Sequence, residues 1–351
     1  MRKLILPKSL LCWFGGWLVL TACCKPACAE DDESTWAQRA WLGPQVGFNI
    51  RAKFSLSGQF PISSSQPGPA GVSGVDHFYN DGYVRVDQTG NAQGFTSFWG
   101  YNSASQYDAG NHTLLMHSAT AYTANAASTH DDEPYVGFQL GYGASPWQWE
   151  KVQLGFEFGF GFLPIRIEDK EPLAALVDQS TYSFDTGGIV LPTAPYNGGP
   201  SGIGPTIHDV ATALSDVTVP SMVTGSRTLA ADLFTFRLGP AVHWNLSHYF
   251  GLSASAGGAL GLVSGDLKFN EQIVLPDGTS ASNTGSIGST EVVYGGFVSA
   301  AARVYVAPHA EIYASIEYMP LGNATFGSAG RHAELDLGGQ LYVSAGLSWP
   351  F

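Results

Sequence analysis

The chain has 351 residues and a formal net charge of −13, and 44% of its residues are hydrophobic against 13% that are charged. An acidic chain repels phosphate, so this balance excludes nucleic acid as a partner. The low charge and the 43 glycines fit alternating strands better than helices.

The first residues have the organisation of a secretory signal peptide. Arg2, Lys3 and Lys8 make a basic start, and an apolar run at residues 10–22 follows. Ala27 and Ala29 then fit the small-x-small rule of signal peptidase, so we expect a signal peptide over residues 1–29, cleaved after Ala29. The apolar run is too short for a comfortable membrane span.

A second interpretation of this segment stays open. Residues 20–23 resemble a lipoprotein box, in which Cys23 would be the lipidated residue. All four cysteines precede the expected cut, so the mature chain would contain no disulfide, thiol nucleophile or cysteine-bound zinc. No cofactor is expected. The cysteines are Cys12, Cys23, Cys24 and Cys28.

After the signal peptide, residues 30–44 are expected to form a short periplasmic lead, with a helical turn or two in residues 30–42. No later apolar run approaches about 20 residues, so we expect no transmembrane helix.

The main signal is an alternation of apolar and polar residues with a period of two, which predicts strands. In residues 45–56 the even positions are apolar from Val46 to Leu56, and the odd face carries Arg51 and Lys53. The pattern therefore predicts about eight antiparallel strands. Strand-like stretches near residues 83–117 could raise the count to ten, but we expect them to extend the sheet or to fold over the barrel outside the membrane. The alternation of apolar and polar residues returns at residues 136–143, 152–162, 234–246, 250–260, 292–306, 311–318 and 334–351.

The connections between these strands alternate in length. Large loops are expected at about residues 57–134 and 165–229, and short turns around Ser145-Pro146, Ser247-His248 and Pro308-His309. Long outer loops with short periplasmic turns are typical of transmembrane β-barrels. A lipid-exposed sheet edge would leave backbone groups unpaired, so the sheet over residues 45–351 must close into a barrel.

The end of the chain supports export to an outer membrane. Phe351 and Trp349 end a run with apolar residues at every second position, which resembles the signal read by the barrel assembly machinery. Trp147, Trp149, Trp244 and Tyr249 map to the short-turn level, where a membrane-interface girdle is expected. These features resemble the OmpA-type family of small outer-membrane barrels, and the resemblance implies a closed barrel of about eight strands. The first two loops are unusually long for that family.

Eight charged residues are expected to face the barrel interior. An eight-stranded barrel is just wide enough for side chains to fill it, and buried charges must be paired. A salt-bridge network that plugs the lumen is one interpretation, and a narrow polar pathway for ions or small solutes is the other. The residues are Arg51, Lys53, Glu157, Arg237, Arg303, Glu317, Glu334 and Asp336, and Arg303 and Glu311 could pair across a tight hairpin.

No motif in the loops predicts catalysis or a metal. Residues 130–133 (His-Asp-Asp-Glu) are the densest set of possible ligands, but adjacent side chains cannot all reach one ion, so we expect a solvated acidic loop and no metal. No nucleophile elbow or zinc-protease motif occurs, and we expect no enzyme activity. Rim residues that an enzyme would draw on are His112, His117, Ser118, Asp131 and His208.

The first loop is rich in aromatic residues, including Trp99, Tyr101 and Tyr107. They are expected to form a small core of the loop, with contact to a partner or a sugar as the alternative. The sequence thus predicts an outer-membrane barrel with a structural or surface-interaction role, in contact with lipid and with a possible extracellular ligand at its loops. The alternatives are a narrow porin-like channel and, after it, a barrel enzyme with a rim active site.

Overall fold

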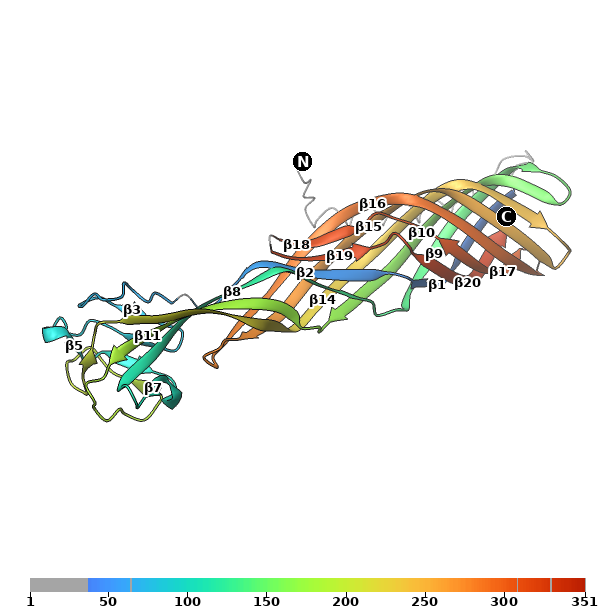
Figure 1. The fold of residues 1–351 in the computed structure, drawn as a ribbon. Helices are drawn as coiled ribbons and strands as arrows, with labels where there is room; N and C mark the ends of the chain where they lie inside the picture. The colour runs from blue at the N-terminus through green and yellow to red at the C-terminus, as the bar shows by residue number, and fades with distance from the viewer. Residues whose placement is uncertain (1–36, 64, 308, 329, 351) are drawn as a thin grey trace.

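The computed structural model describes residues 37–350 apart from 64, 308 and 329. Two compact ends are joined by long strands (Figure 1). The predicted signal peptide, its cleavage after Ala29, the alternative lipidation at Cys23 and the terminal Phe351 lie outside the described residues. No helix in the described part of the chain is long and apolar enough to cross a membrane.

Eight antiparallel strands form a closed ring, which confirms the predicted closed antiparallel barrel. Their order is β10-β9-β1-β20-β17-β16-β15-β14, and β14 pairs in turn with β10. This last pair runs from Val152↔Trp244 to Asp169↔Arg227 without a register shift. The ring strands are β1 (Ala37–Phe48), β9 (Tyr135–Gln148), β10 (Val152–Asp169), β14 (Thr212–Asn245), β15 (Phe250–Val274), β16 (Ser280–Ala307), β17 (Ala310–Tyr318) and β20 (Leu341–Pro350).

Five further strands continue the wall beyond the ring, and we call this part the neck. They follow β14 in the order β11-β8-β2-β19-β18. β14, β15 and β16 reach into the neck because they have 34, 25 and 28 residues, whereas a bilayer is crossed by about 9–11. The neck strands are β2 (Arg51–Phe60), β8 (Thr113–His130), β11 (Leu173–Asp185), β18 (Ala324–Ser328) and β19 (Arg331–Asp336).

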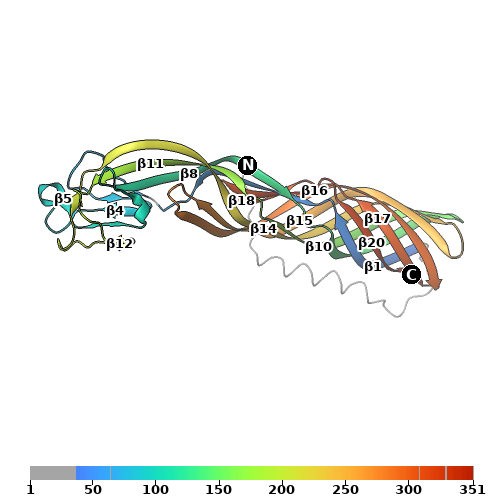
Figure 2. The ribbon, with the colours of Figure 1, turned by 60° about the horizontal axis from the view of Figure 1, so that its bottom comes forward.

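The far ends of β8 and β11 carry a small folded unit, which we call the lobe. Figures 1 and 2 place it at the end of the molecule opposite the ring. Its core contains Trp99, Tyr101, Leu114, Met116 and Phe184. The lobe strands are β3 (His77–Phe78), β4 (Gly82–Val84), β5 (Phe95–Thr96), β6 (Trp99–Tyr101), β7 (Tyr107–Asp108), β12 (Tyr196–Asn197) and β13 (Ile207–His208), with 3-10 turns η2 (Ala92–Gly94) and η3 (Ala104–Gln106).

The predicted total of about eight strands, or ten, is wrong for the chain as a whole. β1–β20 are twenty strands, and only the ring contains eight of them. The segments that were expected to be large loops fold into the neck and the lobe. The stretches near residues 83–117 lie mainly in the lobe and add no hairpin to the ring.

The first predicted strand, residues 45–56, is two strands that belong to different parts of the wall. Asn49 has a φ of 60°, a left-handed conformation that interrupts the extended chain. β1 pairs with β20 and β9 in the ring, whereas β2 pairs with β19 and β8 in the neck. Even-numbered residues therefore change sides: Leu42 is exposed outside the ring, but Phe54 is buried inside the neck.

Other predicted boundaries also need correction. β1 begins at Ala37, so residues 37–44 are part of the ring and not a helical or periplasmic lead. β9 continues to Gln148, which moves the first short turn from Ser145-Pro146 to residues 149–151. Leu335 lies on β19 and is buried in the neck, so the last predicted strand also divides in two.

The outward face of the ring is apolar and the inward face is polar or small. Leu238, Val298 and Leu347 are exposed, whereas Glu157 and Arg303 are buried. Soluble proteins have the opposite arrangement. The four predicted girdle aromatics, Trp147, Trp149, Trp244 and Tyr249, are all exposed at or near the short-turn end of the ring, and Trp349 is exposed on β20.

Candidate functional site

The ring encloses a network of buried charges. Arg237 pairs with Glu317, and Arg303 places Nη2 3.5 Å from Oε1 of Glu157. Arg303 Nη1 also donates to His243 Nδ1 over 2.7 Å. Four of the eight residues predicted to face the lumen, Glu157, Arg237, Arg303 and Glu317, therefore lie in one connected region.

A third ion pair lies in the same lumen and was not predicted. Arg39 of β1 places Nη2 3.2 Å from Oε1 of Glu311, so Glu311 pairs with Arg39 and makes no ion pair with Arg303. Residue 39 had been assigned to the lead. The signal was present, because Ala40 and Leu42 continue the even-numbered apolar series of β1 backwards. Three guanidinium groups thus face three carboxylates in the lumen.

The other four predicted lumen residues lie outside the ring, in the neck. Lys53 is the cross-strand partner of Glu334, and Arg51 is that of Asp336. Arg51 and Asp131 form an exposed ion pair of 3.7 Å. The prediction fails for Arg51 and Lys53 because the chain changes sides at Asn49, so the charged face of β2 points outward. It fails for Glu334 and Asp336 because β19 pairs with β2 in the neck and is not a ring strand.

Glycines on the inner face make room for the large side chains of the lumen. A Cβ atom on Gly159 would overlap the side chain of Arg237, and one on Gly141 would overlap the Trp41 ring. Two small cavities lie among these side chains: one of about 20 Å³ borders Arg237, and one of about 70 Å³ borders Arg39 and Glu157. A water molecule needs about 10–15 Å³ by this measure, so these cavities have room for a few waters.

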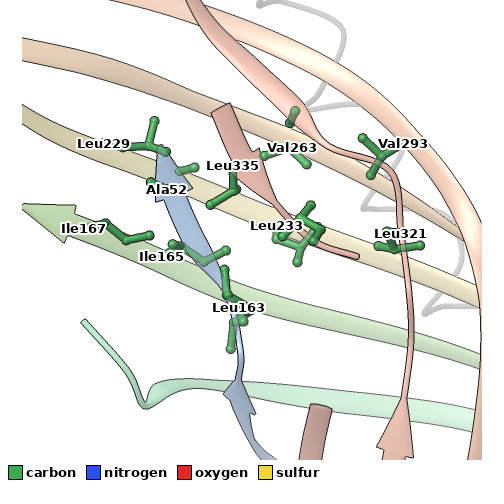
Figure 3. Packing of buried hydrophobic residues seen from close by; sticks show 14 of the residues in the cluster. Ala52, Leu163, Ile165, Ile167, Leu229, Leu233, Val263, Val293, Leu321 and Leu335 are labelled. Atoms are coloured by element: carbon green, nitrogen blue, oxygen red, sulfur yellow. The ribbon is translucent and has the colours of Figure 1, made fainter. Parts of the chain in front are cut away.

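An apolar layer lies directly above the charged lumen, where the ring meets the neck (Figure 3). Leu163, Leu229 and Val263 from ring strands meet Ala52 and Leu335 from neck strands, and all five are buried. These five aliphatic side chains have no polar group that could replace the hydration shell of an ion.

A second buried charge network lies beyond the apolar layer, inside the neck. Arg227 places Nη1 3.1 Å from Oδ2 of Asp169 and Nε 2.8 Å from Oε1 of Glu271. Glu271 Oε2 is also 2.9 Å from Nε of Arg331, and Ser128 donates to Asp169. The two arginines balance the two carboxylates. The alternation of apolar and polar residues did not predict this set, because its members lie in the segments between the predicted strands.

The lobe is held together by buried polar contacts as well as by its aromatic core. The fully buried carboxylate of Asp209 accepts hydrogen bonds from Ser73, the Gly74 amide and Asn91, which joins both large loops. Trp99 and Tyr101 are buried, so the interpretation of the loop aromatics as a small core is confirmed for these two.

Asp87 is a second buried carboxylate of the lobe. Burial opposes its charge, but hydrogen bonds from the side chain and amide of Thr89 and from Ser97 lower the pKa of Asp87 to about 2. The group therefore stays ionised at neutral and mildly acidic pH.

The candidate rim residues do not converge on one catalytic set. Ser118 contacts Ser65, His208 lies 3.9 Å from Asp185, and Asp131 pairs with Arg51. Asp132 and Glu133 accept from the amides of residues 168 and 50, so the acidic stretch holds strands together. His117 differs from these residues because it has a carboxylate at hydrogen-bond distance: its Nδ1 lies 2.6 Å from Oδ2 of Asp81.

No protein-family model and no curated protein matches the chain. Among solved structures, the attachment invasion locus protein Ail of Yersinia pestis, in complex with the heparin analogue sucrose octasulfate, has 10% identity and a TM-score of 0.24, with 90% of this chain and 99% of that chain covered. A FadL homologue of Pseudomonas aeruginosa has 11% identity and a TM-score of 0.18, with 89% and 90% covered. Scores this low carry no argument, and the resemblance to the OmpA-type family stays a prediction.

Proposed function

We propose that the protein is an outer-membrane β-barrel that is closed to solutes and holds a folded lobe outside the cell for surface interaction. The observation that carries the proposal is the inverted ring, which is apolar outside and filled with paired charges inside. Membrane barrels need a closed ring, an outward apolar band and aromatic residues at the interface. The exposed aromatics at the short-turn end fit the periplasmic interface.

Two exposed leucines on β14 provide a matched test of the membrane proposal. Leu238 is 61% exposed in the ring, and Leu214 is 55% exposed at the lobe end of the same strand. In a bilayer, Leu238→Arg should lower the free energy of unfolding by about 2–4 kcal/mol, because it places a charge in hydrocarbon. Leu214→Arg should change it by about 0.5 kcal/mol or less.

The measurement is urea-induced unfolding of both variants, refolded into lipid vesicles. Near-equal, small effects of the two substitutions would contradict a lipid-facing position for Leu238. A water-soluble protein would give that result, since both side chains would already face solvent.

The closed lumen is supported by two successive layers, one ionic and one apolar. Planar bilayers containing the refolded protein should show no steady conductance. Arg237→Ala should also stay silent, because the apolar layer above it is unchanged. Arg51→Ala is the matched control, since Arg51 is an exposed arginine of the neck.

A narrow channel is the alternative, favoured by the polar lining and the two small cavities beside Arg237 and Glu157. It predicts a steady conductance that Arg237→Ala alters and Arg51→Ala leaves unchanged. That outcome would overturn the closed barrel and would leave the membrane location intact.

A further inference from the structure

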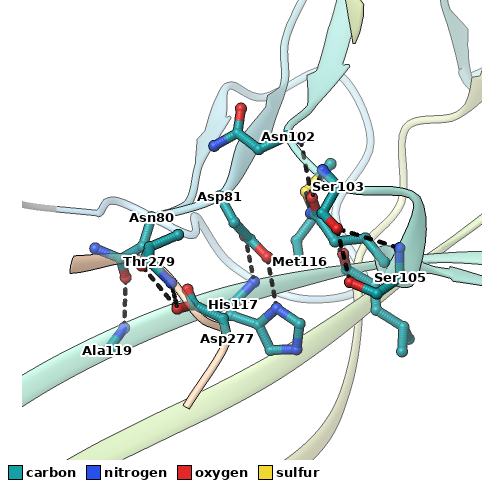
Figure 4. A network of polar contacts seen from close by, with 12 residues as sticks. Asn80, Asp81, Asn102, Ser103, Ser105, Met116, His117, Ala119, Asp277 and Thr279 are labelled. Carbon is teal, nitrogen blue, oxygen red and sulfur yellow. Dashed lines mark hydrogen bonds and ion pairs between the residues drawn. The ribbon is translucent and has the colours of Figure 1, made fainter. Parts of the chain in front are cut away.

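Three segments that are far apart in the sequence meet where the lobe joins the neck (Figure 4). Asp81 comes from the turn between β3 and β4, His117 from β8, and Asp277 from the turn between β15 and β16. One possible ligand atom of each residue lies within 4.8 Å of the other two. Among the described residues this is the one group of three histidine or carboxylate side chains with that geometry.

The Asp81 and His117 side chains are fixed before any ligand binds. Asp81 Oδ1 accepts the His117 amide over 2.8 Å, and Asp81 Oδ2 lies 2.6 Å from His117 Nδ1. The neighbouring Asn80 is tied to β8 in the same way, since its amide donates to the His117 carbonyl and its Oδ1 accepts from the Ala119 amide. The turn and the strand therefore move as one body.

Asp277 is oriented by its own turn. Its Oδ1 accepts from the amide and the hydroxyl of Thr279, over 2.8 and 2.7 Å. Its Oδ2 is buried and has no hydrogen-bond partner among the described residues. A buried carboxylate oxygen without a partner loses its hydration, which is costly unless a cation or a proton satisfies it.

We propose that Asp81, His117 and Asp277 bind one zinc ion. One imidazole nitrogen and two carboxylate oxygens are ligand types that zinc accepts, at about 2.0–2.2 Å, with water in the fourth position. The Thr279 and His117 backbone contacts orient the ligands as outer-shell partners do in metal sites. The ion takes the place of the proton between His117 and Asp81, since a ligand nitrogen must be deprotonated.

A zinc ion at this site would connect two parts of the molecule. The β15–β16 hairpin belongs to the ring and neck, whereas Asp81 and His117 belong to the base of the lobe. A shared ion fastens the hairpin tip to the lobe and fixes how the lobe is held above the barrel. This inference does not depend on whether the lumen is closed.

The test is a titration of zinc chloride into the chelator-treated mature chain (residues 30–351, which contain no cysteine), refolded without an affinity tag and followed by calorimetry. We expect one saturable site per chain. Asp277→Asn should weaken binding at least about tenfold, and it keeps Oδ1 for the Thr279 contacts, so the turn should still fold. His117→Gln is the second variant and should have the same effect.

Asp185→Asn is the matched control. Asp185 is another aspartate of the lobe near a histidine, His208, but the two side chains are 3.9 Å apart and that of Asp185 is 62% exposed. Its substitution should leave the zinc affinity unchanged. Absence of a one-to-one site in the wild-type chain, or equal affinities of Asp277→Asn and Asp185→Asn, would overturn the proposal.

Discussion

Replacing Arg227 by methionine should lower the free energy of unfolding by about 3–5 kcal/mol. The guanidinium is buried between two carboxylates, Asp169 and Glu271, which are themselves 0% and 1% exposed. Methionine preserves much of the volume but leaves two buried carboxylates with Arg331 as the one remaining cation of the network. Removing one partner of a buried ion pair costs more stability than the intact pair contributes, because the remaining charge is buried without hydration or a counter-charge.

Arg51→Met is the matched control for Arg227→Met. Arg51 also pairs with a carboxylate in the neck, but its side chain and that of Asp131 are 56% and 51% exposed. Exposed pairs contribute about 0–1 kcal/mol, so this variant should unfold almost as the wild type does. Adding Asp169→Asn to Arg227→Met should recover most of the loss, since Glu271 then keeps Arg331 as its partner and no unpaired charge remains in the network.

Urea unfolding of these variants, refolded into vesicles, measures the difference. Equal stabilities of Arg227→Met and Arg51→Met would contradict the described network. A double variant no more stable than Arg227→Met alone would show that packing, and not unpaired charge, causes the loss.

The ring could be predicted from the sequence because its signal is local. Within a strand, alternate side chains point to opposite faces, so residues 152–162 or 250–260 define two faces without any knowledge of their neighbours. Short turns between such strands fix which strands pair. The four lumen residues Glu157, Arg237, Arg303 and Glu317 follow from these two local rules. Closure of the sheet follows from a third argument, that a lipid-exposed edge would leave backbone groups unpaired.

The same rule could not show which face meets the core. Residues 45–56 alternate without a break, yet the apolar face lies outside the ring before Asn49 and inside the neck after it. A period of two shows which residues share a side of the strand. It does not show whether that side faces the interior or the outside of the molecule. Arg51 and Lys53 were assigned to the lumen for this reason.

Local sequence patterns could not predict the neck and the lobe, because the contacts that stabilise them join segments far apart in the sequence. Asp209 binds Ser73 and Asn91 across the two large loops. The cluster of Asp81, His117 and Asp277 has no fixed spacing that a motif could contain. Such contacts exist only once the long strands β8, β11 and β14 have brought the loops together.

Trp99→Ala should destabilise the lobe by about 3–5 kcal/mol while the ring stays folded. Trp99 is fully buried, donates from Nε1 to the Pro205 carbonyl over 2.8 Å, and packs against Tyr101 and Tyr196 with ring centroids 5.9 and 4.6 Å apart. Alanine removes these contacts and leaves a cavity. The lobe core is a separate cluster from the apolar layer above the lumen, so the loss should not reach the ring.

Hydrogen–deuterium exchange measures this loss segment by segment. A change of about 3 kcal/mol corresponds to an increase of more than a hundredfold in the opening equilibrium, since about 1.4 kcal/mol is tenfold, so amides of β4 and β6 should exchange much faster. Ring strands such as β17 and β20 should keep their protection. Trp149→Ala, which removes an exposed aromatic at the opposite end, should leave exchange in the lobe unchanged. Faster exchange throughout the ring in Trp99→Ala would mean that lobe and barrel unfold as one cooperative unit. That result would contradict the expectation that the lobe unfolds independently of the ring.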